Sequence, residues 1–157
     1  MSDRSRLALR FVLPAVWLGM LIAIDLLEAP LKFQAPGITI PLGLGIGRLV
    51  FTAMNIAECV LAILLGLAMR GPRLGRRPTA VLLSVFGLLL FKVAVLRTVM
   101  WGHTDAVLAG ESTGGSPVHF LYIAVDAAIF TLLVVFLTLH ARRVRLLPAQ
   151  EGPAATP

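Results

Sequence analysis

The sequence predicts an all-α fold: a bundle of four transmembrane helices with both termini in the cytoplasm. Of the 157 residues, 58% are apolar, and the mean hydropathy is +0.91. Only 14% are charged, against about 25% in soluble domains. These values exclude a soluble globular protein, a disordered chain and, with Cys59 as the only cysteine, a disulfide scaffold. The apolar runs are nearly continuous, which disfavours a barrel of alternating strands.

Four apolar stretches are long enough to cross a bilayer, since ~20 helical residues span ~30 Å of hydrocarbon. The first follows three arginines, so a signal peptide is the alternative there, but no small-residue cleavage site follows it. The predicted spans are about 11–29, 49–69, 79–101 and 118–139, within one domain over 1–147. Residues 148–157 are expected to form a disordered cytoplasmic tail.

The segment 30–48, after the first span, has an unusual composition. Its sequence, PLKFQAPGITIPLGLGIGR, holds three prolines and four glycines, which predicts that it is not a regular helix. It is also too apolar for an ordinary water-exposed loop. We therefore expect an interfacial loop or a short re-entrant dip packed against the helices. The Gly43-x-Gly45-x-Gly47 pattern lacks the preceding strand that a phosphate-binding loop requires.

Basic residues predict the orientation in the membrane. Three precede the first span, four lie between the second and third spans, and three follow the fourth. The opposite side has only Lys32 and Arg48. By the positive-inside rule both termini are cytoplasmic. The net charge of +6 then reflects topology and contact with the lipid bilayer, and no nucleic-acid partner is predicted. The expected location is the cell membrane, of the bacterial inner-membrane type.

Four acids and four bases fall in or at the edge of the spans. Each charge near the bilayer centre costs about 2.5–3.5 kcal/mol on insertion scales, so these residues should face the bundle interior and find partners. The helical rise places Asp25, Lys92 and Asp126 at one level in the outer half, with Glu58 deeper. The predicted intramembrane polar network comprises Asp25, Glu28, Asn55, Glu58, Lys92, Arg97, Tyr122 and Asp126.

Five further residues are predicted at the outer rim: Lys32, Arg48, Trp101, His103 and His119. The i, i+4 spacing of Arg97 and Trp101 permits a cation–π contact. A haem or metal between His103 and His119 would require matching depth on facing helices, and no metal site or cofactor is predicted. Arg97, Trp101, His119 and Tyr122 are also side-chain types that contact quinones.

Three classes of function remain open. The preferred class is permease-like or channel-like handling of protons, ions or small polar solutes through an outer-half polar cavity. Glu58 and Asp126 would be its protonatable sites, tuned by Lys92 and Arg97, and so thin a bundle would require a homodimer or larger complex. The alternative is a non-catalytic accessory or assembly subunit with structural salt bridges, and the third class is a haem- or quinone-binding redox subunit. No catalytic motif is present, so enzyme activity is not predicted.

Overall fold

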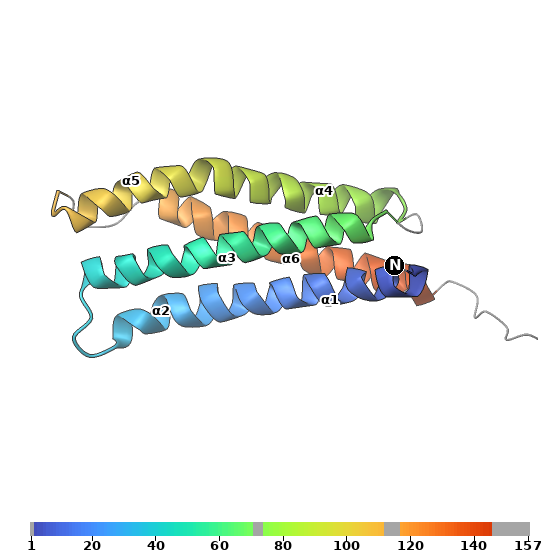
Figure 1. Cartoon of the computed structure of the whole chain (residues 1–157), viewed down its shortest axis with the longest axis horizontal. Coiled ribbons are helices and arrows are strands. Elements are labelled where there is room, and N and C mark those ends of the chain that lie inside the picture. The colour runs from blue at the N-terminus through green and yellow to red at the C-terminus, as the bar shows by residue number, and fades with distance from the viewer. Residues whose placement is uncertain (1, 71–73, 112–116, 146–157) are drawn as a thin grey trace, which may run out of the picture.

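A computed structural model of the chain shows four long helical rods packed side by side (Figure 1). It describes residues 2–70, 74–111 and 117–145, and within these ranges no strand occurs. Each rod contains a stretch long and apolar enough to cross a membrane: Asp3–Gln34, Ile40–Ala68, Arg76–Leu108 and Pro117–Val144. The predicted all-α fold with four spans is therefore confirmed. The predicted tail, 148–157, lies outside the described residues.

The first rod combines four helical segments. It begins with α1 (Asp3–Leu21) and continues through the π-helical η1 (Ile22–Glu28), the short α2 (Ala29–Leu31) and the 3₁₀ turn η2 (Lys32–Gln34). The Ser2 hydroxyl caps α1 by accepting from the Ser5 amide at 3.2 Å. The rod extends past the predicted span in both directions.

The second rod, α3 (Ile40–Ala68), corrects the prediction for residues 30–48. That prediction was wrong for most of the segment, because only 35–39 lie between the first two rods. Pro41 lies in the first turn of α3, where a missing amide proton costs little, whereas Pro30 lies within the continuous first rod, directly after η1. The chain reverses at Gly37, whose φ of +79° favours glycine. An interfacial position of this turn remains a prediction.

The third rod consists of α4 (Arg76–Phe91), the π-helical η3 (Lys92–Leu96) and α5 (Arg97–Leu108), and the fourth is α6 (Pro117–Arg145). In the π-helical segments an amide donates to the carbonyl five residues earlier instead of four, as Ala29 N–H does to Ile24 and Arg97 N–H does to Lys92. Such widened turns are rare and are frequent at functional sites. Here they include Asp25, Glu28 and Lys92, three members of the predicted network.

The rods form a closed ring in chain order. α1 packs on α3 and α6, α6 packs on α4, and α5 packs on α3. The beginning of α1 and the end of α6 lie at the same end of the bundle (Figure 1). Because both lie at one end, the described chain crosses the bundle an even number of times. Gly75, directly before α4, lies against the Arg143 side chain of α6, so the start of α4 is at this end too.

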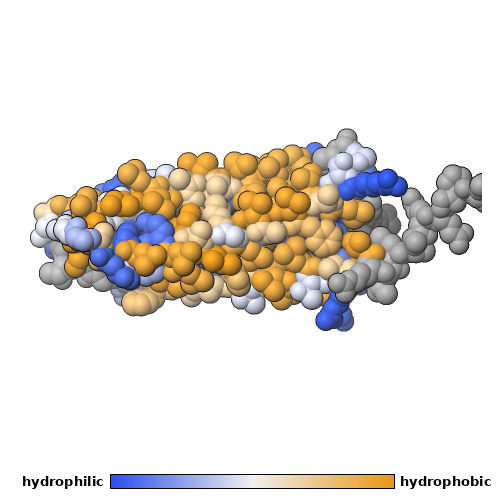
Figure 2. Space-filling view, turned by 90° about the horizontal axis from the view of Figure 1, so that it is seen from below, coloured by the Kyte–Doolittle hydropathy of each residue, from blue (hydrophilic) through white to orange (hydrophobic). Residues whose placement is uncertain are grey.

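The face of the bundle seen in Figure 2 is apolar along most of its length, with hydrophilic residues gathered toward the ends. Leu49, Leu90 and Phe120 are 69–73% exposed. A soluble monomer rarely exposes so continuous an apolar surface, whereas lipid solvates it. The length and apolarity of its four helices thus indicate a multi-pass membrane protein. Cytoplasmic termini and a bacterial inner membrane remain predictions.

Candidate functional site

Two carboxylates from different rods share one buried lysine, and we call these three residues the ion triad. The Lys92 Nζ of η3 lies 2.6 Å from the Glu58 Oε2 of α3. It also forms an ion pair with the Asp126 Oδ1 of α6. The side chains of Lys92 and Glu58 are fully buried, and that of Asp126 is 5% exposed. Three predicted network residues from three rods therefore meet at one point.

The first rod completes the surroundings of the ion triad through Trp17. Its Nε1 donates to Glu58 Oε1 at 3.0 Å. Sequence reasoning missed Trp17, although a buried indole N–H usually finds a partner. Beside the triad, the Tyr122 hydroxyl donates to Asn55 Oδ1 at 2.8 Å, and Lys92 Nζ lies 5.2 Å from the centroid of the Tyr122 ring. All four rods thus contribute polar groups at this level.

The formal charge of the ion triad is −1, because one ammonium group faces two carboxylates. Asp126 Oδ2 is buried and has no hydrogen-bond partner among the described residues. An uncompensated charge in surroundings of low dielectric constant is costly. A proton on one carboxyl group would remove it and would also supply a hydrogen-bond donor. The arrangement can therefore hold one exchangeable proton.

Asp25 does not form an ion pair with the triad but shares a cavity with it. A cleft of about 290 Å³ lies between η1 and α6, and its lining includes Asp25, Asp126 and Tyr122. Leu26 and Ile123 also line the cleft, and they are 66% and 49% exposed. Since these exposed apolar residues line it, the cleft opens on the flank of the bundle, and Asp126 is part of its lining.

A second cavity, which we call the end pocket, lies between η2, α3, α5 and the start of α6 and measures about 200 Å³. It is the place where the predicted rim residues meet. All five of them line it: Lys32, Arg48, Trp101, His103 and His119. Asn55, Arg97 and Tyr122, which were predicted in the intramembrane network, also line it. Tyr122 thus lies between the two sites, because it lines the end pocket and its ring centroid is 5.2 Å from Lys92 Nζ of the ion triad.

The cations of the end pocket differ in their partners. Lys32 Nζ lies 3.2 Å from the Glu28 carboxylate, and Arg48 forms an ion pair with Asp105. The Arg97 guanidinium stacks 4.5 Å from the centroid of the Trp101 ring, so the contact permitted by the i, i+4 spacing is present. Among the described residues, Arg97 has no carboxylate within ion-pair distance. Arg97 and Glu28, which were predicted in the network, therefore form no ion pair with the residues of the ion triad.

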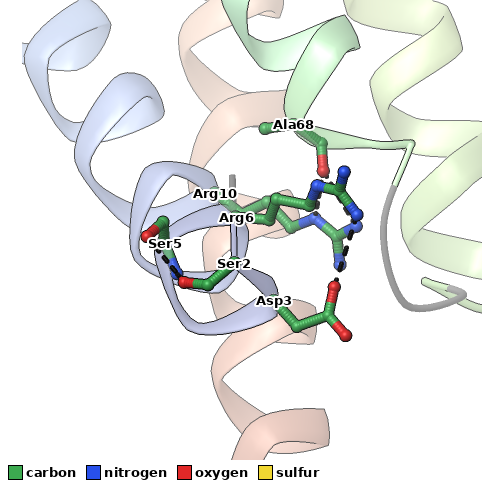
Figure 3. Close-up of polar contacts among 6 residues, drawn as sticks. All are labelled: Ser2, Asp3, Ser5, Arg6, Arg10 and Ala68. Atoms are coloured by element: carbon green, nitrogen blue, oxygen red, sulfur yellow. Dashed lines mark hydrogen bonds and ion pairs between the residues drawn. The ribbon is translucent and has the colours of Figure 1, made fainter.

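Arg10 at the opposite end of the bundle has a structural role that the sequence did not indicate. It is 1% exposed, and its Nε and Nη2 donate to the Ala68 carbonyl at 3.1 and 3.0 Å (Figure 3). The last carbonyls of a helix lack partners within the helix. Arg10 therefore satisfies the end of α3 and fastens it to α1. In the same view Arg6 pairs with Asp3 at 3.3 Å.

The described residues contain no group of three or more His, Cys, Asp or Glu side chains that could hold a metal ion. Comparison with protein-family models, curated proteins and solved structures finds no match to the chain. The function is therefore inferred from the ion triad, the cleft and the end pocket.

Proposed function

We propose that this chain is a small membrane protein that handles protons, ions or small polar solutes at the ion triad, in the manner of a permease or channel. The observation that carries the proposal is the sharing of Lys92 by two buried carboxylates. A triad with one carboxylate in excess can take up and release a proton without unfolding. The cleft that reaches Asp126 supplies a route for that exchange.

In this proposal the three acids have different roles. Asp126 lines the cleft and is the group that exchanges the proton. Glu58 is fully buried and is held by Trp17 and Lys92, so it fixes the lysine in place. Asp25 lines the same cleft and relays protons between its opening and Asp126. The widened turns of η1 and η3 give Asp25 and Lys92 their positions.

The apolar core decides how a transport path must run. Between the ion triad and the end with Arg10, the described interior is apolar and includes the fully buried Leu65, Leu133 and Phe136. A polar route therefore does not continue along the axis of a single bundle. It would follow the flank where the cleft opens, which requires a second copy or another membrane subunit. We accordingly expect a homodimer or larger complex.

Proton flux into proteoliposomes tests the proposal. A potassium gradient with valinomycin drives the flux, and a trapped pH-sensitive dye reports it. We expect Asp126→Asn to lower the flux at least about tenfold, equivalent to about 1.4 kcal/mol, while the protein stays folded. Asp3→Asn, at an exposed residue near the N-terminus, is the matched control and should retain the flux. Equal flux in wild type and Asp126→Asn would refute the proposal.

A second candidate function is a non-catalytic accessory subunit, and one observation favours it. Glu28 and Asp105 each have a basic partner, so two of the carboxylates outside the ion triad already form salt bridges. Glu58→Gln separates the two functions. If it lowers the melting temperature while flux or cellular activity persists, the charges are structural.

A Soret band on purified, haem-supplemented protein would instead support the redox class.

A further inference from the structure

We propose that the end pocket binds a small organic anion, namely a carboxylate carried on a compact apolar body. The first argument is the chemistry of its lining. Lys32, Arg48 and Arg97 all line the pocket, and no Asp or Glu does so among the described residues. The partners of Lys32 and Arg48, Glu28 and Asp105, are outside the lining. The lining is therefore rich in hydrogen-bond donors, and Arg97 is its cation without a carboxylate partner among the described residues.

Arg97 is the group best placed to bind the anion. Its guanidinium is held against the Trp101 ring at 4.5 Å, and Arg48 lies 5.1 Å from the same ring. Stacking fixes the plane of a guanidinium and leaves its edge available for hydrogen bonds. A planar fork of N–H groups matches a carboxylate with two parallel bonds. Since Arg97 has no carboxylate partner in the described part of the chain, a ligand can supply one.

Asn55 provides a second and independent observation. It is 1% exposed, and its Oδ1 accepts from the Tyr122 hydroxyl. Asn55 lines the same pocket, and its Nδ2 is buried and has no hydrogen-bond partner among the described residues. Buried donors are nearly always satisfied, and an orphaned one calls for an acceptor. A ligand whose polar atoms are all acceptor oxygens fits both the Asn55 amide group and the cations.

The walls and the volume define the rest of the ligand. Phe33, Phe51 and Met100 line the pocket together with Trp101, and they suit an apolar body. The volume of about 200 Å³ is below the about 300–1,000 Å³ of pockets for drug-sized molecules. A cavity of about 150 Å³ holds benzene. The ligand is therefore of the size of one ring or a short branched chain bearing a carboxylate.

Two glycines of the Gly43-x-Gly45-x-Gly47 pattern shape this pocket. A Cβ at Gly43 would lie 2.3 Å from the Phe33 ring, and a Cβ at Gly47 would lie 3.0 Å from Lys32 Nζ. Small residues four apart let helices approach closely. The pattern thus brings an aromatic wall and a cation of the first rod onto α3, which is a role that the sequence did not indicate.

Binding of benzoate to the full chain in a neutral detergent tests the proposal. We expect calorimetry to give a Kd of about 1 mM or tighter. Benzamide, a neutral molecule of nearly the same shape, should bind at least tenfold more weakly. Arg97→Gln should weaken benzoate binding at least tenfold, and Arg97→Lys, which keeps the charge but not the fork, should weaken it less. Arg142→Gln, at an exposed base beyond the other end of the core, should bind like wild type.

An anionic lipid headgroup offers the same chemistry from another source. Native mass spectrometry of protein from nanodiscs, with or without phosphatidylglycerol, distinguishes the two. Retention of phosphatidylglycerol that excludes benzoate and is lost in Arg97→Gln would identify a lipid anion. Benzoate binding that is indifferent to the lipid would identify a soluble acid. Equal affinity for benzoate and benzamide, or no binding of any anion, would overturn the proposal. Asp126→Asn should retain benzoate binding, so this result is separate from the flux experiment.

Discussion

Replacing Lys92 with methionine removes the cation that lies between Glu58 and Asp126. The Lys92 and Glu58 side chains are both 0% exposed, so the substitution leaves a buried carboxylate without its cation. Methionine has a similar length and fills most of the space. Removing one partner of a buried ion pair costs about 3–5 kcal/mol. We expect Lys92→Met to lower the free energy of unfolding by that amount.

A neutral triad should recover most of this loss. The triple variant Lys92→Met, Glu58→Gln, Asp126→Asn leaves no charge behind, and the amide oxygen introduced by Glu58→Gln can still accept from the Trp17 indole. Replacing a complete buried ion pair or triad by well-packed hydrophobic residues of similar volume is often close to neutral in stability, and amides that keep hydrogen bonds should come near this limit. We expect the triple variant to unfold within about 2 kcal/mol of wild type.

Denaturant titration in detergent micelles, followed by tryptophan fluorescence, measures these free energies. Arg142→Met, at an exposed residue, is the control and should change stability by less than about 0.5 kcal/mol. The reasoning is refuted if Lys92→Met unfolds within about 1 kcal/mol of wild type, or if the triple variant is no more stable than Lys92→Met alone.

Two further predictions concern the end with Arg10 and the orientation. Arg10→Met loses both hydrogen bonds to the Ala68 carbonyl and should lower the free energy of unfolding by about 1.5–3 kcal/mol. Thermal unfolding measures this loss, with Arg4→Met at an exposed site as the control. Equal melting temperatures of the two variants would contradict the prediction. Reporter fusions after Leu74 and Gly110 should read cytoplasmic and external respectively, and the reverse pattern would invert the predicted topology without affecting the fold.

The meeting of Lys92 and Asp126 could be predicted because helical rise alone places residues at a depth once the ends of a span are known. Glu58 was expected below them, yet it contacts Lys92. How far one rod is shifted along its neighbours depends on packing between the rods, and so does the direction in which a long lysine side chain extends. The sequence of a single span does not determine either of them.

Local composition was a poor guide at two other places. Prolines and glycines in 30–48 predicted irregular backbone, but Pro41 lies in the first turn of α3 and is compatible with it. Arg10 was one of several bases from which the cytoplasmic side was predicted, and its sequence context does not reveal a buried role. That role depends on the Ala68 carbonyl, 58 residues away, which only the tertiary arrangement brings near.

The ion triad also has a consequence for biogenesis. Its residues come from α3, η3 and α6, so ribosomes synthesise Glu58 first, Lys92 next and Asp126 last. An unpaired charge at the centre of a helix costs about 2.5–3.5 kcal/mol during insertion through the translocon. Glu58 therefore enters the bilayer at a disadvantage that lasts until the following hairpin arrives. Insertion of the later rods and packing of the earlier ones are then coupled, and a nascent chain halted before Lys92 leaves an unpaired intramembrane acid that membrane quality control can recognise.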